Sequence, residues 1–102
     1  MKKIICIVAF AIMAAISNAQ MLTNAPVVSV KAGRSLFLKN CAHCHGADAH
    51  GDEGPDLHNL DWTDKQIADR IRSGKKGQMT AFAGKLQTRE IENIIAYLRT
   101  LK

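Results

Sequence analysis

Apolar residues near the start of the chain form one continuous run. The run covers the thirteen residues Ile4–Ile16 (IICIVAFAIMAAI), follows two lysines and precedes Ser17-Asn18-Ala19. A cationic start, a short apolar run and an end with small residues are the three parts of a secretory signal peptide, and the run is short for a membrane span. We therefore expect a signal peptide over residues 1–19, cleaved after Ala19. A retained N-terminal anchor is the alternative.

Beyond this run, apolar positions recur every three or four residues, which is the spacing of one helix face. The first such stretch predicts a helix over residues 30–41, for which Ser29 is a suitable N-cap. One stripe along it contains Gly33, Leu36, Phe37, Asn40, Cys41 and Cys44. The stripe places both cysteines at or just past the helix end, on its buried side. Residues 20–29 show no period and are expected to form a flexible N-terminal arm.

Two further amphipathic stretches predict a second and a third helix. The second begins with Thr63 and Gln66, which have the spacing of a capping box, and ends at Gly74. The third begins near Thr88 and is expected to run to the C-terminus. No segment alternates like a strand, so the expected fold is all-α, with long glycine-rich loops between the helices. Residues 30–102 would form one small domain.

Length and composition indicate that this domain needs a stabilising group. Cleavage after Ala19 would leave 83 residues with few large aromatic side chains. A domain of this size buries little apolar surface and usually depends on a disulfide, a metal or a cofactor. The formal net charge is +5 for the whole chain, and the charges are interspersed. We therefore expect no nucleic-acid partner. We also expect no membrane span after signal cleavage, and a monomer.

Residues 41–46 (CAHCHG) carry the clearest chemical signal. Two cysteines stand three positions apart, and His45 follows the second at once. This is the pattern of covalent haem attachment. The two vinyl groups of haem need cysteines about one helical turn apart, and the next residue can place an imidazole on the iron. We expect one covalently bound haem c, joined to Cys41 and Cys44, with His45 as an iron ligand.

Three other interpretations of the cysteines compete with haem. A zinc site would combine them with His50 or His58, at unusual spacing. A thiol–disulfide redox pair is typical of a βαβ context, which the pattern does not predict. A structural disulfide would close a very small loop and so remove little chain entropy. Apart from these roles, His43, His50 and His58 are interpreted as surface residues, with His58 also considered as a competing iron ligand.

A second axial ligand is expected from a methionine, which raises the reduction potential and suits electron transfer. Cleavage would leave Met21, next to the new N-terminus, and Met79, in the second glycine-rich loop. A loop can lay a thioether against the far face of a ring that the cysteines hold. Met79 is therefore the expected sixth ligand, and the alternative is that it only packs in the core.

Four stretches together resemble the class I c-type cytochromes, the small monohaem cytochromes c. In chain order they are AGRSLFLKNCAHCHG, GDEGPDL, GKKGQM and REIENIIAYLRTL, and the resemblance covers roughly residues 30–101. It implies the cytochrome c fold, in which three or four short helices wrap around one covalently bound haem. It also implies that the first and last helices cross closely at Gly33, Phe37 and Tyr97.

The resemblance adds two contacts at the haem. The carbonyl of Pro55 would accept a hydrogen bond from the second ring nitrogen of His45, which makes that histidine a better iron ligand. Trp62 would reach a haem propionate. One departure concerns Met79, because many relatives have a proline beside the ligand methionine where this chain has Gln78 and Thr80.

The expected function is one-electron transfer by an exported, periplasmic cytochrome of a respiratory chain. Its redox partner would be a terminal oxidase or another reductase. The sequence offers no nucleophile or acid–base pair, so we do not expect an enzyme. The alternative is a haem-based protein that binds or senses a small ligand, with Met79 as a labile ligand because no proline stiffens its loop.

Overall fold

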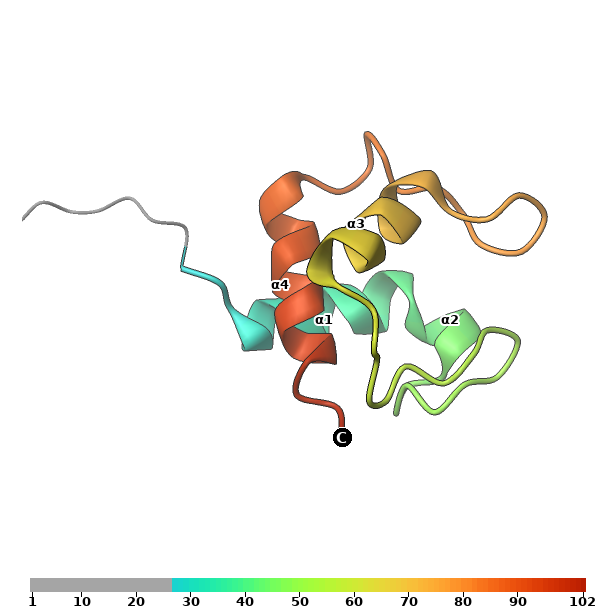
Figure 1. Ribbon diagram of the computed structural model, residues 1–102, viewed down its shortest axis with the longest axis horizontal. Helices are drawn as coiled ribbons and strands as arrows, with labels where there is room; N and C mark the ends of the chain where they lie inside the picture. Colours follow the sequence, from blue (N-terminus) through green and yellow to red (C-terminus); the bar gives the residue numbers. More distant parts are fainter. Residues whose placement is uncertain (1–26) are drawn as a thin grey trace, which may run out of the picture.

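The computed structural model describes residues 27–102, and this part of the chain contains four helices and no strand (Figure 1). The helices are α1 (Val30–Asn40), α2 (Ala42–His45), α3 (Asp64–Ser73) and α4 (Thr88–Leu98). The all-α prediction is confirmed. The expected signal peptide and most of the N-terminal arm lie outside the described residues. None of the helices within 27–102 combines the length and the apolar character needed to cross a bilayer.

Helices α1 and α3 begin where the sequence predicts. The hydroxyl of Ser29 accepts a hydrogen bond from the amide of Ala32 at 3.1 Å. At α3 the Thr63 hydroxyl accepts from the amide of Gln66 at 3.1 Å, and the Gln66 side chain accepts from the amide of Thr63 at 2.8 Å. These contacts satisfy amides that have no partner inside the helix.

Helix α4 begins at Thr88, as predicted, but its C-terminal end differs from the prediction. It starts with a second capping box, in which the amide of Gln87 donates to the carboxylate of Glu90 at 2.9 Å. It ends at Leu98 and does not reach the C-terminus. The amides of Thr100 and Leu101 instead bond to carbonyls three residues earlier, at 2.9 and 3.1 Å. Such tighter bonds satisfy the last carbonyls of a helix and close it.

Helices α1 and α4 cross in close contact, as Figure 1 shows. A Cβ atom added to Gly33 would lie 1.8 Å from the backbone oxygen of Asn93, so only glycine fits here. The side-chain oxygen of Asn93 accepts a hydrogen bond from the amide of Ser29 at 2.8 Å. Beside the crossing, the rings of Phe37 and Tyr97 lie 5.3 Å apart between centroids. The implied close crossing is confirmed.

The core lies where α3 and α1 pack against α4. Its principal side chains are Phe37, Ile67, Ile71, Ile91, Ile94, Ile95 and Leu98. They come from the apolar faces that the sequence predicts. The loops 46–63 and 74–87 both extend beyond this core toward the side of α2, at the right of Figure 1. The elements that carry the predicted site residues therefore lie on one side of the molecule.

Candidate functional site

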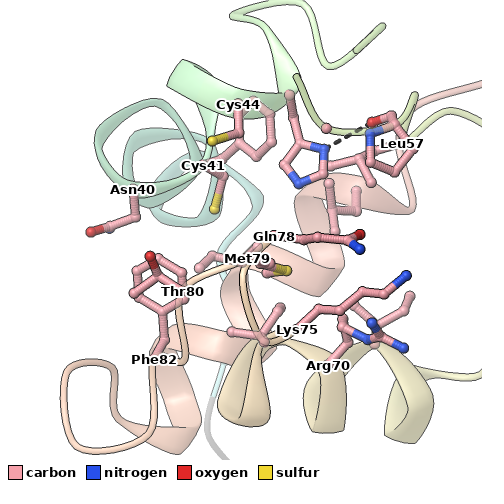
Figure 2. Close-up of a pocket in the computed structure, with 18 of the residues that line it drawn as sticks. Asn40, Cys41, Cys44, Leu57, Arg70, Lys75, Gln78, Met79, Thr80 and Phe82 are labelled. Atoms are coloured by element: carbon pink, nitrogen blue, oxygen red, sulfur yellow. Dashed lines mark hydrogen bonds between the residues drawn. The ribbon is translucent and has the colours of Figure 1, made fainter. Parts of the chain in front are cut away.

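One cavity of about 540 Å³ lies between the α1–α2 region and the two long loops. All five residues that the sequence singles out as cofactor-binding line it: Cys41, Cys44, His45, Pro55 and Met79. Figure 2 shows the two cysteines on one side of the cavity and Met79, with Gln78, on the other. Much of the remaining wall is apolar: Phe37, Leu57, Leu60, Ile67, Ile71, Phe82, Ile94 and Leu98.

The cysteines are placed by a break in the first helix. The amide of Cys41 still bonds to the carbonyl of Phe37 at 2.8 Å, and Cys41 then opens the four-residue helix α2. The amide of His45 bonds back to the carbonyl of Cys41 at 3.0 Å, which makes this segment one helical turn. Cys41 and Cys44 are not joined in a disulfide, and both are half-buried. The prediction put both cysteines at or past the end of one helix and did not foresee α2.

The environment of the thiols does not support the redox or the zinc interpretation. Burial, with a smaller contribution from Cys44, raises the pKa of the Cys41 thiol to about 11. A reactive dithiol needs a lowered pKa, because the thiolate is the nucleophile. Within residues 27–102, the histidines proposed as zinc partners lie with Asp56, and neither cysteine belongs to their cluster.

His45 is buried and held in one orientation. Its Nδ1 lies 2.8 Å from the carbonyl oxygen of Pro55. A carbonyl only accepts, so Nδ1 carries the proton and Nε2 keeps a free lone pair. Gly54 packs against the same ring, since a Cβ there would lie 2.9 Å from Nδ1 and Cε1. The amide of Gly54 also donates to the carbonyl of Cys44 at 2.7 Å. This is the support that a metal-ligating histidine needs.

Met79 lies in a tight turn that follows α3. The amide of Lys75 donates to the carbonyl of Met79 at 2.9 Å, and the amide of Met79 donates to the carbonyl of Lys75 at 2.7 Å. A third bond, from the amide of Phe82 to the carbonyl of Ile71 at 3.0 Å, ties the loop back to α3. Met79 is half-buried and packs against the core. The chain thus holds the Met79 backbone at the cavity without a neighbouring proline.

Sequence reasoning missed two kinds of residue at the cavity. One is Gly54, whose place before Pro55 in a polar loop marks it as a turn residue. Nothing in the sequence indicates that it contacts the His45 ring. The cations Arg70 and Lys75 line the same cavity. Their guanidinium and ammonium groups can pair with carboxylates such as haem propionates.

Trp62 also lines the cavity, and the guanidinium carbon of Arg70 lies 5.4 Å from the centroid of its ring. The contact places the Arg70 cation beside the indole of Trp62. The resemblance implies a haem propionate next to the same indole.

The residues at the cavity fit a haem. Two thiols one turn apart suit two thioether bonds, and an imidazole with a free Nε2 suits iron. A thioether stands on the opposite wall, and the apolar side chains suit a porphyrin. None of these sulfur and nitrogen groups is chemically unsuited to binding haem.

Comparison with known proteins agrees with this fit. The family model described as cytochrome c oxidase, cbb3-type, subunit III matches residues 28–98. The CcoP subunit of the cbb3-type cytochrome c oxidase of Rubrivivax gelatinosus is 40% identical over 75 residues, which cover 68% of this chain and 25% of that protein. The FixP subunit of Azorhizobium caulinodans is 37% identical over 82 residues, which cover 68% of this chain and 28% of that protein. The chain therefore spans little more than a quarter of the length of these relatives.

Solved structures give the same fold. Cytochrome c6 of the diatom Phaeodactylum tricornutum matches with a TM-score of 0.61 and 35% identity, covering 71% of this chain and 92% of that chain. Cytochrome cL of Hyphomicrobium denitrificans matches with a TM-score of 0.64 and 29% identity, covering 69% and 45%. The predicted cytochrome c fold and covalently bound haem c are confirmed. The chain belongs to the family of subunit III of cbb3-type cytochrome c oxidases, and it is a class I c-type cytochrome.

Proposed function

We propose that this c-type cytochrome is exported and carries one electron at a time in a periplasmic respiratory chain, with a terminal oxidase or another reductase as its partner. The observation that carries the proposal is the convergence of two thiols, an imidazole and a thioether on one apolar cavity. The two relatives named above are subunits of an oxidase. Because the chain spans little more than a quarter of their length, an oxidase partner remains part of the proposal.

We further propose that Cys41 and Cys44 form the thioether bonds, and that His45 and Met79 are the two axial ligands. Bound haem supplies an iron that alternates between Fe(III) and Fe(II). The hydrogen bond from His45 Nδ1 to the carbonyl of Pro55 keeps Nε2 directed at the cavity in both states. The bonds between Met79 and Lys75 do the same for the Met79 backbone. Electron transfer then needs little movement of the protein, and the chain contributes no catalytic step of its own.

A small-ligand sensor is the competing function, because Met79 has exposed neighbours on both sides, Gln78 and Thr80. The two backbone bonds between Met79 and Lys75 favour a retained ligand. A sensor requires that carbon monoxide displace Met79 readily from reduced iron. A carrier requires that Met79 stay bound in both oxidation states.

The test uses the full chain, expressed with haem-maturation machinery, and a matched pair of variants. We expect the mass to rise by one haem and the increase to survive denaturation. The oxidised protein should show the methionine-to-iron charge-transfer band. Met79→Ala should remove this band and lower the potential by about 0.1 V or more. Met21→Ala removes the other methionine of the expected mature chain and should change neither property.

Two outcomes would contradict the proposal. A mass increase that is lost on denaturation would exclude the thioether bonds. If the reduced parent protein binds carbon monoxide as fast as Met79→Ala does, the protein is a ligand binder and not a carrier with a retained methionine.

A further inference from the structure

The loop after α2 brings two histidine side chains together, outside the set of haem-binding residues. The amide of Leu57 donates to the carbonyl of Ala49 at 2.9 Å, so the residues that follow each of them lie side by side. The rings of His50 and His58 are stacked, with centroids 3.8 Å apart and planes that differ by 7°. Sequence reasoning interpreted both mainly as surface residues, with zinc binding beside the cysteines and, for His58, iron binding as alternatives. Neither belongs to the expected haem-binding set.

Asp56 faces both rings. Its Oδ1 lies 2.7 Å from Nδ1 of His58, and its Oδ2 lies 3.8 Å from Nδ1 of His50. The backbone amide of His58 also donates to Oδ1, at 2.9 Å. The hydrogen bonds from the amide and then the ring of His58 lower the pKa of Asp56. Oδ2, which faces His50, takes part in neither of these two hydrogen bonds and is available as a ligand.

We propose that His50, Asp56 and His58 bind a divalent first-row transition-metal ion such as Zn²⁺ or Cu²⁺. Each residue offers one ligand atom, and these atoms lie within 4.8 Å of one another. Atoms bound to one ion at about 2.1 Å lie at most about 4.2 Å apart. Because the lone pair of an imidazole nitrogen lies in the ring plane, the two stacked rings must turn toward a common point to form the site. Two imidazoles and one carboxylate suit zinc, copper and nickel.

The exposure of the cluster fits an open site. The side chains of His50 and Asp56 are 61% and 52% exposed, whereas that of His58 is 13% exposed. Water can therefore fill the remaining coordination positions. Magnesium and calcium are disfavoured, because they prefer several oxygen ligands and the cluster offers one carboxylate.

A simpler role for these residues would be to fasten the loop. That role needs only Asp56 and His58, which already share two hydrogen bonds. It leaves the ring of His50 with only its stacking contact on His58 and a 3.8 Å approach to Asp56. His50 is therefore the residue whose replacement best distinguishes a metal site from a loop contact.

The test is a titration of ZnCl₂ into the haem-loaded full chain, made without a histidine tag and treated with a chelator. Calorimetry should show one ion per chain. His50→Ala and Asp56→Asn should each weaken zinc binding by about tenfold or more. His43→Ala removes an exposed histidine outside the cluster and should leave the affinity unchanged. The haem absorption spectrum of each variant serves as the check that the fold is intact.

Electron paramagnetic resonance with one equivalent of CuCl₂ gives a second, independent result. Coupling to two imidazole nitrogens is expected in the parent protein, and to one in His50→Ala. The proposal is overturned if His50→Ala binds zinc as tightly as His43→Ala does. It is also overturned if copper couples to no more than one nitrogen in the parent protein.

Discussion

If Met79 ligates the haem iron as proposed, replacing Gly74 by alanine should displace the Met79 side chain from it, because the backbones of these two residues are in close contact. Gly74 follows α3 with φ 63° and ψ −160°, a conformation that only glycine adopts readily. A Cβ atom there would lie 2.4 Å from the carbonyl oxygen of Met79 and 2.7 Å from the backbone of Thr80 and Ala81. The substitution therefore acts on the backbone of the ligand loop and removes no haem contact.

The size of the effect follows from these distances. An ordinary contact begins near 3.4 Å, so the Met79 carbonyl must move by about 1 Å to accept the new atom. The strained conformation of alanine adds about 1–3 kcal/mol. Overpacking adds a further cost of about 1–3 kcal/mol, and the sum of about 2–6 kcal/mol is enough to favour a loop position in which the thioether no longer binds the iron.

Gly77→Ala is the matched control. Gly77 lies in the same loop with φ 74°, so alanine is strained there too, but its Cβ would meet nothing within 4 Å. We expect Gly74→Ala to weaken the methionine-to-iron charge-transfer band and to bind carbon monoxide at least about tenfold faster than Gly77→Ala, which corresponds to about 1.4 kcal/mol. Equal rates in the two variants, with the band retained in both, would refute the role of the contact. Loss of the band in both would assign the effect to backbone strain alone.

Two further substitutions test other close contacts, and a third serves as a control. Gly33→Ala would place a Cβ atom 1.8 Å from the backbone of Asn93, so α1 and α4 must separate. The free energy of unfolding in urea should fall by about 3 kcal/mol or more. An unchanged midpoint of urea unfolding would contradict the close crossing. Gly54→Ala should tilt the ring of His45 and shift the haem potential, because its Cβ would lie 2.9 Å from that ring. Pro55→Ala keeps the backbone carbonyl that accepts the hydrogen bond from His45, so the haem potential of this variant should match that of the parent protein. Equal shifts of the potential in Gly54→Ala and Pro55→Ala would contradict a specific effect of the Gly54 contact on the His45 ring.

The starts of α1 and α3 could be predicted because capping depends on residues three positions apart. Ser29 and Thr63 are typical N-cap residues, and each bonds as the local pattern indicates. Gln87 is not a typical N-cap residue, so its pairing with Glu90 was missed. The end of α4 at Leu98 was also missed, because no glycine or proline follows to mark it.

At the haem site too, features set by neighbouring residues could be predicted, and features set by residues far apart in the sequence could not be predicted from spacing alone. Cys41, Cys44 and His45 form one helical turn, so their spacing alone predicts their chemistry. Pro55 and Met79 were placed through the resemblance and the loop composition. Both line the same cavity as the motif, with Met79 on the side opposite the cysteines (Figure 2). The roles of all five remain predictions.

The cluster of His50 with His58 could not be predicted. It depends on the pairing of Leu57 with Ala49, and Ala49 adopts φ 61° there. Alanine rarely takes this conformation and is not a turn signal. A local pattern therefore gives no reason to expect the two rings to meet across the loop.

The cavity also explains how so small a domain can be stable. Leu57, Leu60 and Met79 pack against the core but are only partly buried, and all three line the cavity. Haem held between them would complete their burial at about 25 cal/mol for each square ångström of apolar surface removed from water. Since this burial exists only with haem in place, the free energy of holding haem is also free energy of folding. Two thioether bonds, as proposed for Cys41 and Cys44, would therefore do more than retain a redox group. They would make the missing part of the core a permanent part of the chain, so that folding would no longer depend on the concentration of free haem.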